Sequence, residues 1–204
     1  MTESVEAAKR ALRQRVRARR RTTTAADTAD TAAELARRVV SLPEIAQAGV
    51  VAAYLALPGE PPTQTLLQLL AERGVQVLLP VVLPDLDLDW ALDDGSRQAG
   101  PRLGILEPSG PRLGTAAIAG ADVVLVPALA VDGRGARLGQ GGGCYDRALT
   151  RVRADVLVVA LLHDDELLAE PVPTDDHDRP VGAVVTSLRV VRFEAGPSGP
   201  RLEP

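Results

Sequence analysis

Apolar residues recur along this chain with the spacing of amphipathic helices. In residues 4–20 they lie three and four positions apart, which predicts a helix with one apolar stripe. Other segments of helix-compatible composition end just before a proline or a glycine, and one such segment directly follows a glycine-rich stretch. These segments predict further helices at residues 26–42, 64–73 and 145–153.

Short apolar runs bounded by glycine, proline or polar residues alternate with these helices and predict buried strands. The predicted strands cover residues 49–57, 75–82, 122–129, 155–162 and 181–191, and a half-buried strand with period-two alternation covers residues 86–92. Such alternation predicts a single three-layer α/β/α domain with a largely parallel or mixed central sheet. We expect this domain to span residues 1–193 and residues 194–204 to form a loose tail rich in glycine and proline.

Composition and charge narrow the class of protein. A length of 204 residues suits one domain with a single core. The net charge of −4 argues against a bulk nucleic-acid binder. A single cysteine, Cys144, excludes an internal disulfide and suits a reducing compartment. Because no apolar run reaches transmembrane length, we expect no membrane partner. We also expect a cytoplasmic monomer without a nucleic-acid partner.

A glycine-rich stretch follows the apolar run at residues 122–129. Six glycines fall within the eleven residues 133–143. Successive backbone N–H groups in such a loop can cradle an anion, and arginines such as Arg137 present a planar fork of donors to phosphate. Asp146 is a plausible Mg²⁺ ligand, because Mg²⁺ combines carboxylate oxygens with phosphate oxygens. The alternative is a surface turn with solvated arginines.

Three other places carry candidate chemistry. In the first helix, Lys9 and Arg13 are four residues apart and project from the same side, so they form either a phosphate clamp or a solvated basic face. Glu60 follows a predicted strand, where open α/β sheets bind ligands, although a solvated loop acid is the alternative. Thr63 precedes a predicted helix and is placed to cap it. The acidic segment 172–180 is either a metal site or a solvated turn.

A long, ordered set of motifs resembles the signature of the 5-formyltetrahydrofolate cyclo-ligase family, the methenyltetrahydrofolate synthetases. The central motif comprises Val126 to Asp132, Gly135, Arg137 to Gly139, Gly141 to Gly143 and Tyr145-Asp146. Flanking matches are Lys9 to Arg13, the segment with Tyr54, Leu55, Glu60 and Thr63, the segment Gly104 to Pro108, which we take as structural, and Val172-Pro173 with Asp178. The matches run in one order from Lys9 to Thr186.

This resemblance implies a mixed α/β sheet between helices and an activity that uses ATP and Mg²⁺ to convert 5-formyltetrahydrofolate into 5,10-methenyltetrahydrofolate. It implies ATP binding by Lys9, Arg10, Arg13, Arg137, Leu138, Gly139, Gln140, Gly141, Gly142, Gly143, Cys144 and Tyr145. It implies folate binding by Leu55, Glu60, Trp90, Gln140, Gly141, Gly142, Gly143 and Cys144. Arg137 and Tyr145 would be catalytic, and Asp146 and Asp178 would bind Mg²⁺.

Two departures from the family pattern leave alternatives open. Cys144 stands where tyrosine is usual, and Gln140 stands where tyrosine or arginine is frequent. Both changes favour a non-catalytic, nucleotide-binding paralogue as the second hypothesis. An RNA-associated protein that uses its basic first helix and a sugar-phosphate isomerase are further alternatives. For Trp90, packing in the core is the alternative to stacking beside the folate pterin.

Overall fold

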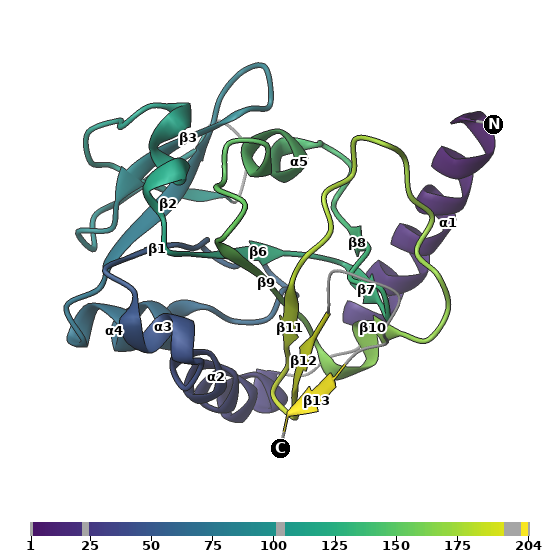
Figure 1. Cartoon of the computed structure of the whole chain (residues 1–204), viewed down its shortest axis with the longest axis horizontal. Coiled ribbons are helices and arrows are strands. Elements are labelled where there is room, and N and C mark those ends of the chain that lie inside the picture. Colours follow the sequence, from purple (N-terminus) through teal and green to yellow (C-terminus); the bar gives the residue numbers. More distant parts are fainter. Residues whose placement is uncertain (1, 22–24, 101–104, 194–200, 204) are drawn as a thin grey trace.

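The main sheet organises the molecule. A computed structural model of the chain describes residues 2–21, 25–100, 105–193 and 201–203 (Figure 1). Within these residues an eight-stranded sheet has the order β13-β12-β11-β9-β6-β1-β2-β3. Its strands, in chain order, are β1 (Val50–Ala52), β2 (Gln76–Val82), β3 (Leu88–Leu92), β6 (Val123–Pro127), β9 (Leu157–Leu161), β11 (Ala183–Val185), β12 (Val190–Arg192) and β13 (Arg201–Glu203).

The centre of this sheet is parallel and its edges are antiparallel. The strands β11, β9, β6, β1 and β2 run parallel to one another, with Val51 opposite both Val77 and Val123. At the two edges, β3 pairs antiparallel with β2, and β12 pairs antiparallel with β11 and β13. The central strands are valine-rich and buried, as parallel strands covered on both faces should be. The predicted α/β class with a mixed central sheet is confirmed.

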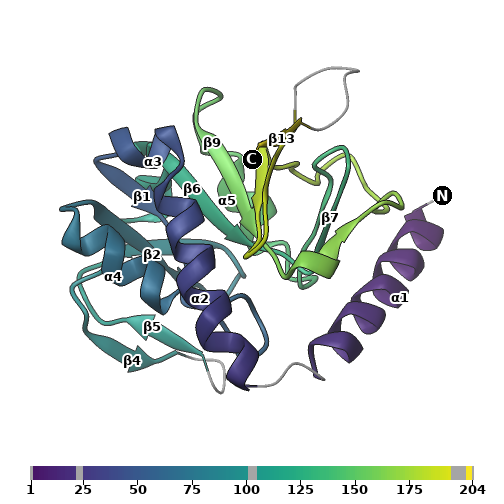
Figure 2. The same ribbon diagram turned by 90° about the horizontal axis from the view of Figure 1, so that it is seen from below.

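One face of the sheet is covered by α2 (Ala25–Val40), α3 (Pro43–Gln47) and α4 (Gln64–Glu72). Figure 2 shows α2 and α4 lying side by side against the strands. Leu35 of α2 and Leu66 and Leu70 of α4 are fully buried in this core. Each such leucine contributes about 1.5–3 kcal/mol through burial of its apolar surface. The prediction that the second helix ends before Pro43 is correct, but the short helix that begins there was not predicted.

The opposite face has a thinner cover, made of α5 (Cys144–Leu149) and the 3-10 helix η1 (Thr115–Gly120). Trp90 of β3 and Ile118 of η1 are fully buried there, together with Ala148 of α5. These elements complete the third layer of the domain. The helix predicted for residues 145–153 is therefore real but shorter, and its last residues form turns.

A second, small sheet lies beside the main one and supports the first helix. It consists of β10 (Leu167–Leu168), β7 (Ala130–Asp132) and β8 (Arg137–Leu138), in that order. The helix α1 (Thr2–Arg20) packs Leu12 and Val16 against Leu138 and its apolar neighbours. Figure 1 shows α1 at this side of the molecule, away from α2 and α4. Among the described residues, no helix has the length and apolar character needed to cross a membrane.

Two predicted strands are divided in the structure. Residues 181–191 form the hairpin β11–β12, because the Thr186 hydroxyl accepts hydrogen bonds from the backbone of Leu188 and Arg189 and closes a turn. Residues 122–129 form β6 only to Pro127. The chain then turns into β7, which belongs to the other sheet. In both cases the apolar run continues past the point at which the chain changes direction, so apolar character alone did not mark the end of the strand.

Other predicted boundaries were also too generous. The run predicted at residues 49–57 is a strand only over β1, and residues 53–57 leave the ladder toward Thr63. The excursion after β3 contains an additional hairpin of β4 (Arg97–Ala99) and β5 (Leu106–Pro108). In the predicted tail, Arg201–Glu203 forms β13 against β12, so the tail is not loose throughout. The remaining tail residues, 194–200 and 204, lie outside the described residues.

Candidate active site

A cavity of about 690 Å³ opens where α1, the glycine-rich stretch and the carboxyl ends of the central strands meet. This is the edge at which open α/β sheets bind ligands. The site residues predicted from sequence that line it are Lys9, Arg13, Leu55, Glu60, Arg137, Leu138, Gly139, Gln140, Gly141, Gly142, Gly143, Cys144, Tyr145, Asp146 and Asp178. The fold therefore collects residues from both halves of the chain around one space.

The first part of the glycine-rich stretch is a hairpin rather than a free loop. Strands β7 and β8 pair antiparallel, and the Asp132 carboxylate accepts hydrogen bonds from the backbone of Arg134, Ala136 and Val172. Gly135 has φ of +80°, and a Cβ there would lie 2.5 Å from the carbonyl oxygen of Val181. Glycine is required at this point both for its conformation and for the close approach.

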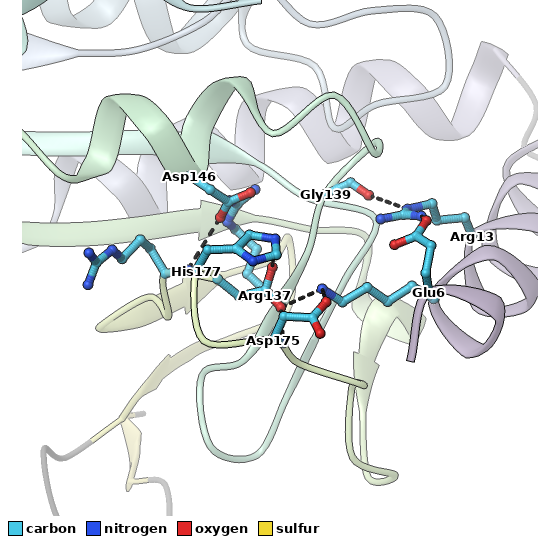
Figure 3. A network of polar contacts seen from close by, with 10 residues as sticks. Glu6, Arg13, Arg137, Gly139, Asp146, Asp175 and His177 are labelled. Carbon is cyan, nitrogen blue, oxygen red and sulfur yellow. Dashed lines mark hydrogen bonds and ion pairs between the residues drawn. The ribbon is translucent and has the colours of Figure 1, made fainter. Parts of the chain in front are cut away.

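The second part of the stretch, residues 139–143, forms the cavity wall beside α1. The Arg13 Nε donates a hydrogen bond of 3.1 Å to the carbonyl oxygen of Gly139. Gly141 has φ of +102°, and a Cβ there would lie 3.3 Å from Cζ of Arg13. Arg13 also pairs with Glu6 at 2.8 Å. Figure 3 shows these two side chains extending from α1 toward Gly139. The loop backbone thus passes close beneath a guanidinium group.

Lys9 connects α1 to the acidic segment near residue 175. Its Nζ lies 2.8 Å from Asp175 and 2.6 Å from Asp178, and the residue is only 4% exposed. Burial lowers the pKa of Lys9, but the hydrogen bonds and charges of the two carboxylates outweigh burial and raise it. Lys9 therefore remains a cation at the rim of the cavity, already paired with acids.

Asp146 lies beside Arg137, at the start of α5. The Arg137 NH2 group donates to Asp146 Oδ1 at 2.6 Å, and the backbone N–H of Arg179 donates to the same oxygen at 3.3 Å. Arg137 is 5% exposed, and its Nε has no partner among the described residues. Because Arg179 follows Asp178 in the chain, the two predicted metal ligands approach the same side of the cavity.

These carboxylates fit a Mg²⁺ ion that is shared with phosphate oxygens. Among the described residues, Oδ2 of Asp146 and Oδ1 of Asp178 accept no hydrogen bond, although His177 Nε2 lies 3.9 Å from the latter, so each acid has an oxygen that can turn to a cation. The described residues hold no cluster of three or more His, Cys, Asp or Glu that could bind a metal alone. Mg²⁺ commonly takes one or two carboxylates and completes its shell with phosphates and water.

Glu60 and a set of apolar residues also line the cavity. The Glu60 carboxylate accepts hydrogen bonds from the Leu57 backbone at 3.0 Å and from Gln140 Nε2 at 3.1 Å. Burial raises the pKa of Glu60 despite these bonds. Burial also raises the pKa of Tyr145, so its phenol stays neutral and can donate a hydrogen bond. The Tyr54 hydroxyl is buried without a partner among the described residues.

Three predictions about individual residues are wrong in placement. Trp90 is fully buried in the core and does not line the cavity, because β3 turns its indole inward against Ile118. Arg10 is exposed on the other side of α1 and does not line the cavity either. Thr63 precedes α4 but makes no side-chain cap. Its hydroxyl instead donates to the Tyr54 carbonyl oxygen.

The sequence analysis also missed part of the cavity wall. The additional apolar lining residues are Tyr54, Leu57, Pro80, Val82, Leu88, Ile105, Leu106 and Pro127. Ile105 and Leu106 belong to the segment that we took as purely structural, of which Gly104 lies outside the described residues. Their position in the sequence could have identified some of these residues, because Pro80, Val82 and Pro127 lie near the carboxyl ends of predicted parallel strands.

Comparison with known proteins agrees with this geometry. The family model for the 5-formyltetrahydrofolate cyclo-ligase family matches residues 5–187. A 5-formyltetrahydrofolate cyclo-ligase of Mycolicibacterium smegmatis is 43% identical over 144 residues, which cover 68% of this chain and 74% of the relative. The enzyme of the same name from Escherichia coli K12 is 34% identical over 181 residues, which cover 86% of this chain and 98% of the relative.

A solved structure of a similar protein has a similar fold. An NMR structure of the 5,10-methenyltetrahydrofolate synthetase of Aquifex aeolicus superposes with a TM-score of 0.79 at 29% identity, covering 93% of this chain and 95% of that one. The family model spans both the helix that carries Lys9 and the segment that carries Asp178. The similarity therefore includes every part of the chain that forms the cavity, and the chain belongs to the 5-formyltetrahydrofolate cyclo-ligase family.

Proposed function

We propose that this protein converts 5-formyltetrahydrofolate into 5,10-methenyltetrahydrofolate, with consumption of ATP in the presence of Mg²⁺ and release of ADP and phosphate. The observation that carries the proposal is the mixed lining of one cavity, which combines basic side chains, loop N–H groups and two carboxylates with an apolar wall and the buried Glu60. We assign the phosphates to the first group of residues, the polar end, and the folate to the second group, the apolar end. Such a lining suits a polyphosphate and a flat heterocycle bound side by side.

At the polar end, the chain supplies positioning and neutralisation of charge. Lys9, Arg13 and the N–H groups of residues 139–143 would hold the ATP phosphates. Arg137 would act mainly by holding Asp146 in place, because its NH2 group is already engaged with that carboxylate. A Mg²⁺ ion held by Asp146 and Asp178 would neutralise phosphate charge when bound. ATP would then compete for Lys9 with Asp175 and Asp178.

The proposed chemistry needs no nucleophile from the protein. The formyl oxygen of the substrate attacks the γ-phosphorus of ATP, and the bond to the β–γ bridging oxygen breaks to release ADP. The N10 nitrogen then attacks the activated formyl carbon, its proton passes to the phosphate, and the carbon–oxygen bond breaks to release that phosphate and leave the methenyl ring. Phosphoryl transfer of this kind depends on alignment and electrostatic stabilisation. Tyr145, a neutral phenol on the cavity wall, can donate a hydrogen bond to a developing oxyanion.

At the apolar end, Glu60 would fix the folate. Its buried carboxylate accepts hydrogen bonds, and the pterin ring offers N–H donors that match it. Leu55, Tyr54 and the loop at residues 140–144 would enclose the ring. Trp90 takes no part in this contact, since its side chain is fully buried in the core.

A direct assay tests the proposal. Purified protein is mixed with Mg-ATP and 5-formyltetrahydrofolate, and methenyltetrahydrofolate is followed by absorbance while phosphate release is measured in parallel. We expect both products in equal amounts. The departures at Gln140 and Cys144 favour one competing hypothesis, a nucleotide-binding paralogue without catalysis. That hypothesis predicts ATP binding without folate-dependent phosphate release.

A further inference from the structure

A chain of hydrogen bonds joins the surface of α1 to the buried acid of the site. Arg17 NH2 donates to Gln140 Oε1 at 2.8 Å and to the Gln140 carbonyl oxygen at 3.0 Å, and its Nε contacts the same Oε1 at 3.3 Å. Gln140 Nε2 then donates to Glu60 Oε1 at 3.1 Å. The three residues are 123 and 80 positions apart in sequence, so only the tertiary structure brings them together.

Arg17 determines which way the Gln140 amide faces. A glutamine side chain carries a donor and an acceptor of nearly the same shape, and its neighbours decide its orientation. A guanidinium group can only donate, so it holds the amide oxygen toward α1. The amide N–H is then the group that faces Glu60, whose carboxylate can only accept while ionised. Without Arg17, the amide is free to turn its oxygen toward the acid.

The end of α1 that carries Arg17 is firmly anchored. Arg20 forms a two-pronged pair with Glu166, at 2.6 and 2.9 Å, and also donates to the Ala128 carbonyl oxygen at 2.6 Å. The side chains of this pair are only 8% and 4% exposed. Bidentate pairs of this type hold geometry tightly. Arg17, one turn earlier, is therefore presented to Gln140 by a fixed helix end.

We propose that Arg17 is a positioning residue for folate, which acts through Gln140 to hold the Glu60 carboxylate in place and oriented toward the substrate. The inference rests on the proposed function, because it assumes that Glu60 receives the folate ring. It gives Arg17, which reaches Glu60 through Gln140 without lining the cavity, a role toward folate, whereas Lys9 and Arg13 on the same helix line the cavity and serve the phosphates. It also gives a role to Gln140, which differs from the usual family residue, because this glutamine links Arg17 to Glu60.

Other charged and titratable groups surround Glu60. Arg20 lowers the pKa of Glu60 and Glu166 raises it, so the two charges of this pair act on Glu60 in opposite directions. Tyr54 and Tyr145 face Glu60 from the cavity wall, and burial raises the pKa of each of them. His163 contacts the carbonyl oxygen of Gly59, next to Glu60. The hydrogen bond from Gln140 lowers the pKa of Glu60, whereas burial by itself raises this pKa and favours the protonated acid.

Two variants and a matched control test the inference in the full-length protein. Arg17→Met and Gln140→Met each remove the link while keeping an unbranched side chain. The control is Arg19→Met, which makes the same charge change on an exposed arginine of α1 that does not line the cavity. We expect the KM for folate to rise about five-fold in each test variant, the size of one partly exposed hydrogen bond. The KM for ATP should change little, and the control should match the wild type.

The pH dependence provides a second readout. Loss of the Gln140 hydrogen bond raises the pKa of Glu60 further, so activity should fail at a higher pH on the acid side in both variants. The double variant should behave like either single variant, because the two residues act as one unit. Unchanged folate KM and an unchanged acid limb in both single variants would overturn the inference.

A third measurement separates this inference from the proposed function. The Glu60 carboxyl is titrated by NMR in ligand-free protein and assigned by its loss in Glu60→Gln. Arg17→Met should raise the titration midpoint, whether or not the wild type turns over. An inactive wild type with a shifted midpoint would reject the activity and retain the link. An unshifted midpoint in an active enzyme would reject the link and retain the activity.

Discussion

Two helical regions of the molecule are built on different physical principles. The side formed by α2 and α4 rests on a continuous apolar core of the main sheet, with Leu35, Leu66 and Leu70 fully buried. The side formed by α1, which lies on the small sheet, buries few apolar residues, chiefly Leu12 and Val16, and is held by ion pairs of Lys9 and Arg20. Apolar burial is non-directional and stable, whereas polar contacts are specific and can be exchanged for those of a ligand.

This difference separates the scaffold from the wall of the site. Lys9, Arg13 and Arg17 all project from α1 into contacts with segments more than 100 residues away. A ligand with negative charge competes for the same cations. The scaffold side carries no such residues into the cavity, and none of its helices lines it. Substitutions on the two sides should therefore fail in different ways.

The largest expected effect is on the scaffold side. Leu66→Ala removes a fully buried side chain and should lower the free energy of unfolding by about 3 kcal/mol, the usual cost of a core cavity. Denaturant titration measures this loss, and the KM for ATP of the folded fraction should not change. The matched substitution on α1 is Leu12→Ala, which should cost less stability and raise the KM for ATP. Equal losses of stability with unchanged KM in both variants would contradict the comparison.

The next largest effect is expected at Asp146. Asp146→Asn removes one anionic ligand of the proposed Mg²⁺ ion but keeps an oxygen that can accept from Arg137. We expect turnover to fall about 100-fold, the scale of losing one electrostatic contact to the transition state. The melting temperature should change little. Assays at limiting Mg²⁺ check this assignment, and unchanged turnover there would remove Asp146 from the metal site.

A smaller effect is expected for the cation on α1. Lys9→Ala should raise the KM for ATP about ten-fold, because a charged contact to phosphate is lost. The KM for folate should rise less, since Lys9 contacts Asp175 and Asp178 rather than Glu60. Arg10→Ala is the control, because Arg10 is exposed and outside the cavity. An equal rise for both substrates, or an effect of Arg10→Ala as large, would argue against a phosphate clamp.

We expect the ionised Glu60 side chain to lower the stability of the folded protein while it supports folate binding. Its pKa is raised in the folded state, so the native protein binds a proton more tightly than the unfolded chain. Stability from this group falls as pH rises from the ordinary glutamate pKa through the folded value. Glu60→Gln should therefore be at least as stable as the wild type at pH 7, with the difference vanishing in acid, while folate binding is lost. Thermal melts across pH measure this, and a less stable variant at pH 7 would contradict it.

The smallest effect is expected at Cys144. If backbone N–H groups of residues 139–145 hold the phosphates, Cys144→Ser should keep its activity within about two-fold, since no charged contact is lost. Cys144→Tyr restores the usual family residue and should be tolerated, with added aromatic surface for the folate. Steady-state kinetics distinguish this from a nucleophilic thiol. Near-complete loss in a folded Cys144→Ser, with a substrate-protected adduct, would replace direct phosphoryl transfer with covalent catalysis.

Local patterns in the sequence predicted the main helices and the central strands, and the family signature predicted many of the residues that line the cavity. Helical spacing predicted α1, a possible cap and a terminal glycine predicted α4, and apolar runs predicted β2, β6 and β9, because these signals arise within a few neighbouring residues. The glycine-rich signature identified residues 137–146 because a loop that closely approaches a ligand needs particular residue types in a short, ordered stretch. Boundaries were less certain, as the division of residues 181–191 shows.

Only the tertiary structure decided which partner each polar side chain meets. Periodicity could not tell whether the indole of Trp90 faces the core or the ligand, because both faces of β3 are partly covered. Nor could it pair Lys9 with Asp175, or Arg17 with Gln140 and Glu60, since these contacts join segments that are distant in the chain. Such pairings depend on how the sheet and helices pack, and no local spacing encodes them.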